Sequence, residues 1–476
     1  MINRRNFLKL VSGCAATLPL WPGVSRRFAH GDTLGATQDR PNVLLIILDD
    51  MNNWIGCFGG HPDVKTPNMD RLARRGVIFT NAQCAAPLCN PSRVSFFTGI
   101  RPSTSGVYKN EMPYRGVMPD VVTLPEHFMT HGYTAAGGGK LLHHDKVTDP
   151  VCWDESFLRT VGITRINPFP QSVPVCGIPD FQGIDWGPMP VDDTEIHDGK
   201  VARWGGSVLR RTHDKPFLLG VGFFMPHLPY YVPNKYLDMY PPESITLPPL
   251  KEDDLEDVPP QGAKWAVPHR IRKIREYGQW RNAVAGYLAG ISFVDAQVGY
   301  VLDALDESPY LNNTVVVLWG DNGFHLGEKL HFGKSTLWEE SARVPLIMAA
   351  PGITTPGGIC TKPVSVMDVY PTLNELCGLT PKPELECRSI LELLQNPQSS
   401  AWNGVPVLTT YGQGNHSLRD ERYRYIRYSD GTEELYDHQA DPHGWTNLAN
   451  DSGHAAIKEN LKRYLPRFDA PSAPAT

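Results

Sequence analysis

The sequence predicts an α/β fold with a large mixed, mostly parallel sheet sandwiched by helices, followed by a smaller C-terminal α+β subdomain that contains an antiparallel sheet. Three observations favour this fold. Residues 42–48 are apolar on both faces, as a central strand between two helix layers must be. Residues 314–319 repeat that character. Between about residues 38 and 380, short apolar strands alternate with helical stretches, which is typical of such a sheet.

The elements between these two strands fit the same scheme. Residues 216–224 are a third largely apolar run, and residues 286–305 have helical periodicity with an apolar face. Proline-rich stretches at residues 168–190 and 229–260 predict long loops rather than regular elements. Because long loops over a sheet edge often carry binding residues, we expect them to build a substrate cleft.

A change of character near residue 383 marks the predicted domain boundary. A predicted helix over residues 366–379 is followed by Pro381-Lys382-Pro383, which breaks it. Further on, residues 423–428 and 433–436 alternate like paired antiparallel strands around a Ser-Asp-Gly turn. We therefore expect a catalytic domain over residues 38–383 and a C-terminal subdomain over residues 384–476.

Composition and charge exclude some classes of function. The 476 residues are 41% hydrophobic and carry a formal net charge of −6, whereas nucleic-acid binding usually rests on an excess of Lys and Arg. We expect no nucleic-acid partner, and any anionic substrate must meet a local basic pocket. Beyond the N-terminus no run of about 18 apolar residues occurs, so no transmembrane segment is expected in the mature protein.

The N-terminus predicts export. Arg4-Arg5-Asn6-Phe7-Leu8-Lys9 is a twin-arginine pattern, and a short apolar stretch follows it. We interpret residues 1–37 as a signal segment read by the twin-arginine export machinery, which gives a periplasmic or extracellular protein. Residues 11–14 also resemble a lipobox, so lipid anchoring at Cys14 competes with simple removal of the signal, which we favour.

Oxygen-rich pairs follow the two buried strands. Asp49-Asp50 comes directly after the first strand, and Asp321-Asn322 follows the other. Ligands bind beyond the carboxyl ends of strands in open α/β sheets, so these four donors are expected to converge. Three carboxylates close together need a cation, and oxygen ligands suit Ca²⁺ or Mg²⁺. Taken alone, either pair is better explained as a helix cap or a solvated turn, since Asp and Asn are common in both.

The segment from Cys89 to Gly99 carries the most specific pattern. Asn90 is a good N-cap, Pro91 suits the first helical position and Gly99 suits the stop, so a short helix is expected directly after Cys89. Cys89 would then lie at a helix N-terminus, where backbone N–H groups favour an anion. Arg93, about one turn further on, would point back to the same place.

The order Cys-x-Pro-Ser-Arg-x-x-x-x-Thr-Gly matches the signature of the formylglycine-dependent sulfatases, within the alkaline phosphatase superfamily. This resemblance implies an alkaline phosphatase-like fold and a calcium-dependent sulfuric ester hydrolase. It also implies that a formylglycine-generating maturation enzyme oxidises Cys89 to formylglycine (3-oxoalanine), whose hydrate is both nucleophile and metal ligand. Asp49, Asp50, Asp321 and Asn322 would be the other metal ligands, with Ca²⁺ favoured over Mg²⁺ by the resemblance.

Further positions resemble the iduronate 2-sulfatase branch of this family. Gly139-Lys140-Leu141-Leu142-His143 resembles its Gly-Lys-x-x-His segment, and Pro226-His227-Leu228-Pro229 resembles its Pro-His-x-Pro turn. Lys334 stands where the family places a second sulfate-binding lysine. Asn322 departs from the branch, which commonly has His there, and matches the arylsulfatases. More weakly, His325, His416 and Arg419 are candidate substrate contacts.

The resemblance implies a mechanism and a substrate class. Arg93, Lys140 and Lys334 would hold the sulfate, His227 with Lys334 would protonate the leaving oxygen, and His143 would take the proton that releases sulfate. Iduronate 2-sulfatase-like motifs suggest a sulfated saccharide, such as a uronate 2-O-sulfate from a glycosaminoglycan or an algal polysaccharide. The alternatives are a phosphoester or phosphonate monoester hydrolase of the same superfamily and a non-catalytic surface protein that binds sulfated glycans.

Overall fold

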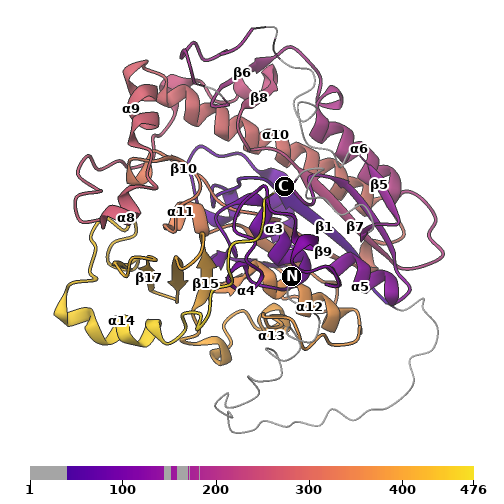
Figure 1. The fold of residues 1–476 in the computed structure, drawn as a ribbon. Helices are drawn as coiled ribbons and strands as arrows, with labels where there is room; N and C mark the ends of the chain where they lie inside the picture. The colour runs from indigo at the N-terminus through magenta and orange to yellow at the C-terminus, as the bar shows by residue number, and fades with distance from the viewer. Residues whose placement is uncertain (1–39, 144–151, 158–169, 171, 182, 476) are drawn as a thin grey trace. The chain divides into compact units, whose positions relative to one another are not determined.

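An eight-stranded sheet forms the centre of the fold, with β1 (Asn42–Leu48) in its interior (Figure 1). The structure is a computed structural model that describes residues 40–143, 152–157, 170, 172–181 and 183–475. Five of the pairings are parallel, and the two made by β12 are antiparallel, so the predicted mixed, mostly parallel sheet is confirmed. The strand order is β13 (Gly358–Cys360), β2 (Val77–Phe79), β12 (Leu346–Ala349), β9 (Thr314–Gly320), β1, β7 (Phe217–Phe223), β4 (Thr134–Gly139) and β5 (Glu155–Phe157).

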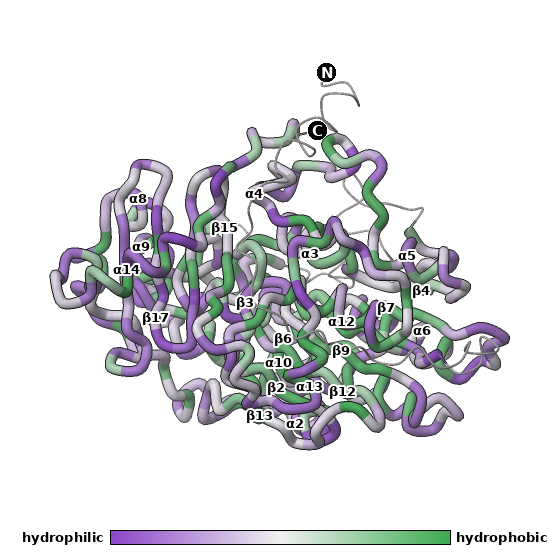
Figure 2. The backbone as a smooth tube through the Cα atoms, turned by 90° about the horizontal axis from the view of Figure 1, so that it is seen from below, coloured by the Kyte–Doolittle hydropathy of each residue, from purple (hydrophilic) through white to green (hydrophobic). Residues whose placement is uncertain are grey.

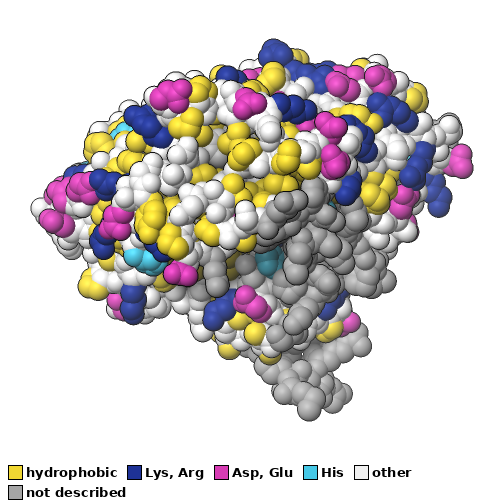
Figure 3. Space-filling view, turned by 90° about the horizontal axis from the view of Figure 1, so that it is seen from above, with side chains coloured by type: hydrophobic (Ala, Val, Ile, Leu, Met, Phe, Trp, Pro, Cys, Tyr) yellow, Lys and Arg dark blue, Asp and Glu magenta, His cyan; other side chains and the backbone are white. Residues whose placement is uncertain are grey.

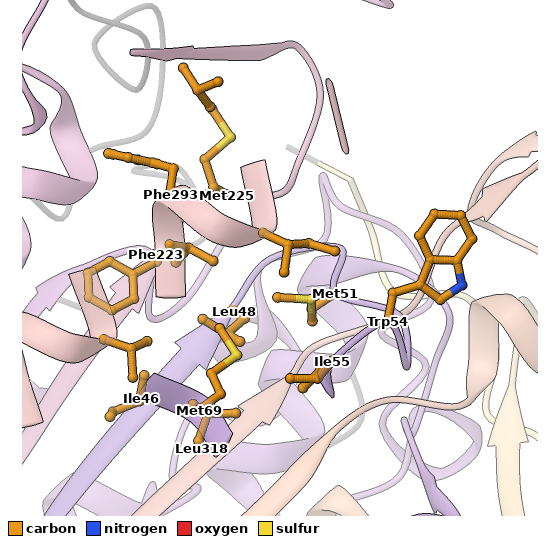
Figure 4. Close-up of a cluster of buried hydrophobic side chains, with 14 of the residues drawn as sticks. Ile46, Leu48, Met51, Trp54, Ile55, Met69, Phe223, Met225, Phe293 and Leu318 are labelled. Carbon is orange, nitrogen blue, oxygen red and sulfur yellow. The ribbon is translucent and has the colours of Figure 1, made fainter. Parts of the chain in front are cut away.

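Side chains of β1 alternate between two hydrophobic cores, one on each face of the sheet. Leu44, Ile46 and Leu48 belong to the core shared with α2 (Pro67–Ala73), α6 (His197–Leu209) and α10 (Trp280–Asp306). Figure 4 shows Ile46 and Leu48 beside Met69 and Leu318 in this core. Val43, Leu45 and Ile47 belong to the second core, with α3 (Cys89–Thr98), α5 (Leu124–Thr130) and α12 (Val369–Leu376). The helices thus sandwich the sheet, as predicted.

Helix α10 is the longest helix of the described residues and extends the predicted helix of residues 286–305 in both directions. Its length and apolar composition would suffice to cross a membrane, yet 83% of its most apolar window is buried inside the structure. Asp295 on this helix accepts hydrogen bonds from the backbone N–H groups of Asn68 and Met69, at 3.1 and 2.8 Å, at the start of α2. These contacts are those of a core helix.

A second, four-stranded antiparallel sheet lies in the C-terminal part of the chain. Its strands are β15 (Val407–Thr410), β16 (His416–Arg419), β17 (Tyr423–Arg427) and β18 (Glu433–Asp437), in that order. Strands β17 and β18 are the predicted hairpin, with Ile426 opposite Glu434. The antiparallel sheet predicted for this part is therefore confirmed, while the domain boundary at residue 383 stays a prediction.

The shorter elements surround these two sheets. Figure 2 shows green, hydrophobic segments along the inner strands and more purple, hydrophilic segments at the outer loops. The remaining helices and strands are α4 (Pro102–Ser105), α7 (Asn234–Leu237), α8 (Pro260–Ala263), α9 (Pro268–Glu276), α11 (Glu339–Ala342), α13 (Leu391–Gln395), α14 (Ala455–Lys462), β3 (Ala82–Gln83), β6 (Trp186–Met189), β8 (Tyr230–Pro233), β10 (His325–Leu326), β11 (Phe332–Gly333) and β14 (Val364–Ser365).

Two local expectations were wrong. Helix α3 begins at Cys89 with Leu88 as its N-cap, so Asn90 is not the cap. The Asn90 side chain lies inside the first turn and donates to the carbonyl oxygens of Lys109 and Met112, at 3.0 and 2.9 Å. The stretches 168–190 and 229–260 are not all loop, because β6 lies in the first and β8 and α7 lie in the second. Parallel pairing of β8 with β6 supplies backbone hydrogen bonds that the local proline content does not predict.

Gly139, at the end of β4, is required by a close approach of two strands. Its φ of 73° is left-handed, and a Cβ there would lie 2.0 Å from the carbonyl oxygen of Gly222 on the neighbouring strand. Gly59 has a similar φ of 64°, but nothing lies within 4 Å of its Cβ position. Comparing substitutions at the two glycines therefore distinguishes the cost of backbone strain, which both share, from the cost of a steric collision, which only Gly139 has.

We expect Gly139→Ala to lower the free energy of unfolding by about 3 kcal/mol or more, because collision with backbone adds to strain. Gly59→Ala should cost only about 1 kcal/mol, the strain of a left-handed alanine. Chemical denaturation monitored by tryptophan fluorescence measures both. Equal losses in the two variants would contradict the close approach at Gly139.

Candidate active site

The ends of β1 and β9 bring three carboxylates together. Leu48 lies opposite Gly320 in the parallel pairing, so Asp49-Asp50 and Asp321-Asn322 emerge side by side. The backbone N–H of Asp50 donates to Asp321 Oδ1 at 3.0 Å, and Asp50 has a left-handed φ of 58°. One carboxylate oxygen from each of the three aspartates lies within 4.8 Å of the others. The predicted convergence of these side chains is what the structure shows.

Three cationic side chains offset this buried negative charge. Arg93 Nε donates to Asp321 Oδ2 at 2.7 Å, and its Nη2 lies 3.4 Å from Asp49 Oδ1. Lys140 Nζ donates to Asp49, and Lys334 Nζ donates to Asp50. Burial alone would raise the pKa of Asp49, but the neighbouring cations, Lys140 foremost, together outweigh it and hold that pKa well below 3.8. The two effects oppose each other as expected for a buried ion pair.

Cys89 lies against these charges at the first turn of α3. Its side chain is 0% exposed, its Sγ donates to Asp49 Oδ1 at 3.4 Å, and Lys334 Nζ donates to the same Sγ at 2.9 Å. Burial, reinforced by Asp49, raises the pKa of the Cys89 thiol far above 9.0, so the thiol is protonated at neutral pH. Since the thiolate is the nucleophile of cysteine chemistry, an unmodified Cys89 is poorly suited to attack.

The residues after Cys89 fix helix α3 to the segments that follow strands β9 and β4. Ser92 Oγ donates to the carbonyl oxygen of Asp321 at 2.5 Å, and Arg93 Nη1 donates to the carbonyl oxygens of Lys140 and Leu141. Gly99 ends α3 with a left-handed φ of 69°, as predicted. The motif thus ties together α3, β9 and the end of β4, which carries Lys140.

His227 approaches from the loop after β7. Asp198 accepts hydrogen bonds from the backbone N–H groups of Phe224 and Met225, both at 2.9 Å, and so holds this loop. His227 Nε2 lies 3.6 Å from Asp50 Oδ2, and its Nδ1 lies 2.5 Å from the carbonyl oxygen of Leu228. A carbonyl only accepts, so Nδ1 carries hydrogen and Nε2 faces the site. Burial lowers the His227 pKa to about 4.

Asn322 supplies an observation that bears on metal binding. Its Nδ2 donates to Asp50 Oδ1 at 2.8 Å, while its buried Oδ1 has no hydrogen-bond partner among the described residues. An unsatisfied buried oxygen beside three carboxylates is the donor set of a hard cation such as Ca²⁺ or Mg²⁺. The residues present therefore fit a divalent metal.

The remaining candidates are His143 and the three weaker ones, His325, His416 and Arg419. His143 lies three residues beyond Lys140 and is half-buried. Both ring nitrogens of His325 contact its own loop, at Glu328 O (3.1 Å) and Thr336 Oγ1 (3.0 Å). His416 Nε2 lies 3.1 Å from a carboxylate oxygen of Asp469. Arg419 Nε lies 3.1 Å from Glu339 Oε2, in a buried cluster with Arg424.

A cleft of about 510 Å³ opens onto the site, and Asp50, His227 and Lys334 line its inner end. Its other wall is built by residues that sequence reasoning did not identify. They come from α9 and the segment before it, from the β10–β11 hairpin and from the turn after β15, and no local pattern marks them. They are Lys264, Trp265, Arg270, His331 and Tyr411.

Comparison with known proteins finds the same family over most of the chain. The family model described as Sulfatase matches residues 41–379, and that for N-sulphoglucosamine sulphohydrolase, C-terminal, matches residues 327–470. A sulfatase of Formosa agariphila is 39% identical over 91% of this chain and 87% of its own, and iduronate 2-sulfatase of Mus musculus is 27% identical over 90% and 94%. The solved phosphonate monoester hydrolase from Silicibacter pomeroyi shares the fold, with a TM-score of 0.75, 22% identity and coverage of 89% and 94%.

Glu339 generates a stability prediction. Burial alone would raise the pKa of Glu339, but the positive groups around it, Arg419 and Arg424 foremost, together lower that pKa to well below 4.5. The contribution of Glu339 to stability is therefore present above about pH 4.5 and is lost as the pH falls toward the folded-state pKa. We expect Glu339→Gln to cost about 3 kcal/mol at pH 7, because it leaves buried guanidinium groups unpaired. Denaturation at pH 7 and pH 4 measures this.

The matched control is Glu307→Gln. Glu307 pairs with Arg210 at 2.9 Å, but its side chain is 64% exposed, so its removal should change stability by less than about 0.5 kcal/mol. A loss in Glu339→Gln no larger than in this control would show that the cluster does not stabilise the fold.

Proposed function

We propose that this chain, which belongs to the sulfatase family and is a sulfuric ester hydrolase, cleaves its substrate with a formylglycine hydrate made from Cys89. The observation that carries the proposal is the position of Cys89 Sγ, between Asp49 and Lys334 at the start of α3. A buried, protonated thiol is a weak nucleophile there. An aldehyde hydrate in its place supplies a hydroxyl nucleophile close to both charges.

Asp49, Asp50, Asp321 and Asn322 would hold the divalent cation, together with the modified residue 89. Bound there, the cation would polarise the sulfate and lower the pKa of the attacking hydroxyl. The charges support this: three carboxylates are matched by Arg93, Lys140 and Lys334. Added divalent charge would leave the site positive, and the negative charge of a sulfate ester would offset it.

The side chains of the site divide the remaining tasks. Arg93 and Lys140 would orient the sulfate oxygens, and Lys334 would donate to the ester oxygen. Burial disfavours the charged form of Lys334, but the negative charge of Asp50 and its neighbours raises the Lys334 pKa and keeps the side chain protonated. His227 presents Nε2 to the site and, once protonated, would donate the proton to the leaving oxygen. Its pKa is lowered by burial, and the negative charge of a bound sulfate would raise it again. His143 is proposed as the base that releases sulfate.

The proposed substrate is a sulfated saccharide, of the uronate 2-O-sulfate kind found in glycosaminoglycans and algal polysaccharides. Similarity to iduronate 2-sulfatase supports this choice. So does the aromatic wall of the cleft, where the rings of Trp265 and Tyr411 lie 4.8 Å apart. Comparing sulfate with phosphate and phosphonate esters tests the hydrolase alternative, and glycan binding without sulfate release would favour the non-catalytic one.

Export remains part of the proposal. The twin-arginine pattern and Cys14 lie outside the described residues, so the sequence alone supports a signal segment and a periplasmic or extracellular location. Fractionation of the native host, with the N-terminus of the mature protein sequenced, tests both export and lipid attachment.

We expect peptide mass spectrometry of protein from a host that matures sulfatases to find an aldehyde or its hydrate at residue 89. Cys89→Ala should then reduce sulfate release by several orders of magnitude, because the nucleophile is lost. The control is Cys84→Ala, which removes a buried thiol whose Sγ contacts Ser341 O at 3.6 Å and should leave residue 89 modified. Substantial sulfatase activity in Cys89→Ala would rule out this mechanism.

We expect Ca²⁺ to raise the denaturation midpoint of metal-stripped protein, since a ligand bound only by the folded state stabilises it by about 2.7 kcal/mol at a hundred times its Kd. Asn322→Leu should remove most of that gain by deleting an oxygen ligand. Asn374→Leu is the control, because Asn374 is also a buried amide without a hydrogen-bond partner among the described residues but lies on α12. An equal Ca²⁺ response in both variants would contradict a metal at Asn322.

A further inference from the structure

Arg270, on the first turn of α9, is a half-buried cation without a counter-charge among the described residues. Its side chain makes one long contact, from Nη1 to the carbonyl oxygen of Phe332 at 3.4 Å, and no ion pair with a described carboxylate. Burial lowers its pKa, and no neighbouring carboxylate raises it again. Guanidinium groups in partly buried positions are normally paired, so Arg270 has spare capacity for an anion.

Arg270 lies where two cavities meet. It lines the cleft of about 510 Å³ that reaches Lys334, and it also lines an adjoining cavity of about 360 Å³ with His269 and Lys273. Ile184 lines both cavities as well. A ligand that extends from the catalytic end into the second cavity would therefore pass Arg270.

The charges along this path favour an anionic ligand. In the larger cleft, Lys264, Arg270 and Lys334 are cationic, and Asp50, a proposed metal ligand, is the one carboxylate among its described lining residues. In the smaller cavity, the charged lining residues are two cations, Arg270 and Lys273, and one carboxylate, Asp180, which forms no ion pair with either of these two described side chains. On the outer face seen from above, Figure 3 shows Lys and Arg interspersed with Asp and Glu instead. A cleft of one sign attracts the opposite charge.

Hydrogen bonds fix this wall relative to the catalytic lysine. The backbone N–H of Val267 donates to His331 Nδ1 at 3.1 Å, so Nδ1 is an acceptor and Nε2 carries the hydrogen. That Nε2 donates to the carbonyl oxygen of Lys334 at 2.8 Å. Burial lowers the His331 pKa to about 4, which keeps the ring neutral, as this arrangement requires. Arg270 is thus held at a defined position from Lys334.

We propose that Arg270 binds a second anionic group of the substrate, a carboxylate or a sulfate that is not hydrolysed, and that the cavity with Lys273 takes the next anionic unit of the same chain. This rests on the proposed sulfatase function. The planar guanidinium group can donate two parallel hydrogen bonds to either oxyanion. The substrate is then a saccharide with at least two anionic groups, so small aryl sulfates lack part of the recognition.

The test compares Arg270→Gln with Arg272→Gln. Arg272 is exposed, lies on the same helix and lines neither cavity, so the control removes an equal charge nearby. Affinity is measured by calorimetry in the Cys89→Ala background, with a disaccharide that contains a 2-O-sulfated uronate and a 6-O-sulfated hexosamine. We expect Arg270→Gln to weaken binding about tenfold or more and Arg272→Gln to have little effect.

Two further probes identify the anionic group. If the partner is the uronate carboxylate, the methyl ester of the disaccharide should bind both variants alike; if it is the second sulfate, the probe without 6-O-sulfate should do so. Lys273→Gln should weaken binding of the corresponding tetrasaccharide about tenfold and leave the disaccharide unaffected. Equal binding of all probes by Arg270→Gln and Arg272→Gln, including no binding by either, would overturn the proposal.

Sulfate release by the mature parent enzyme is measured separately, with the same saccharides and with an aryl sulfate. Release from these substrates together with no difference between the two arginine variants would contradict the role of Arg270 alone. The absence of release from every ester would contradict the proposed function instead.

Discussion

The active site depends on the pairing of three fully buried carboxylates with three fully or largely buried cations. Parallel pairing of β1 with β9 makes Asp49, Asp50 and Asp321 neighbours, so their charge cannot be relieved by movement of one strand alone. The cations come from three other places in the chain: α3, the end of β4 and the segment after β11. Removal of one partner from such a cluster typically costs about 3–5 kcal/mol. The architecture of the fold is therefore also the architecture of the site.

The sequence predicted those elements in which the pattern of apolar residues reflects which faces are buried. Strands β1 and β9 are continuous apolar runs because both of their faces are buried, and the β17–β18 hairpin alternates because its faces differ. Strand β4 escaped this reasoning, since its sequence Thr-Ala-Ala-Gly-Gly-Gly is poor in strand-forming residues. Its glycines are required by distant residues: a Cβ on Gly137 would lie 2.6 Å from Trp153, and one on Gly138 would lie 2.5 Å from Trp204.

The same distinction separates the site residues. Cys89 and Arg93 belong to a contiguous motif, so resemblance located them, and their contacts with Asp49 and Asp321 follow from two strong strands. No sequence motif marks the residues of the cleft wall. Arg270 becomes part of the cleft only because α9 packs beside the β10–β11 hairpin in the folded protein. Arg419 illustrates the converse: an arginine in a polar strand looks available to substrate, whereas tertiary contacts give it Glu339 as a partner.

Burial of Cys89 constrains the order of events before catalysis. The side chain is 0% exposed, and every side chain of α3 around it is buried as well. A maturation enzyme has to reach the sulfur atom, so the proposed oxidation has to precede folding of this segment. The unmodified chain can still fold, because the thiol is neutral and Asp49 accepts its hydrogen. Folding and the proposed activation are therefore separable: the charge pairing that stabilises the fold needs no aldehyde, whereas the proposed modification of Cys89 has to reach a sulfur atom that the folded protein buries.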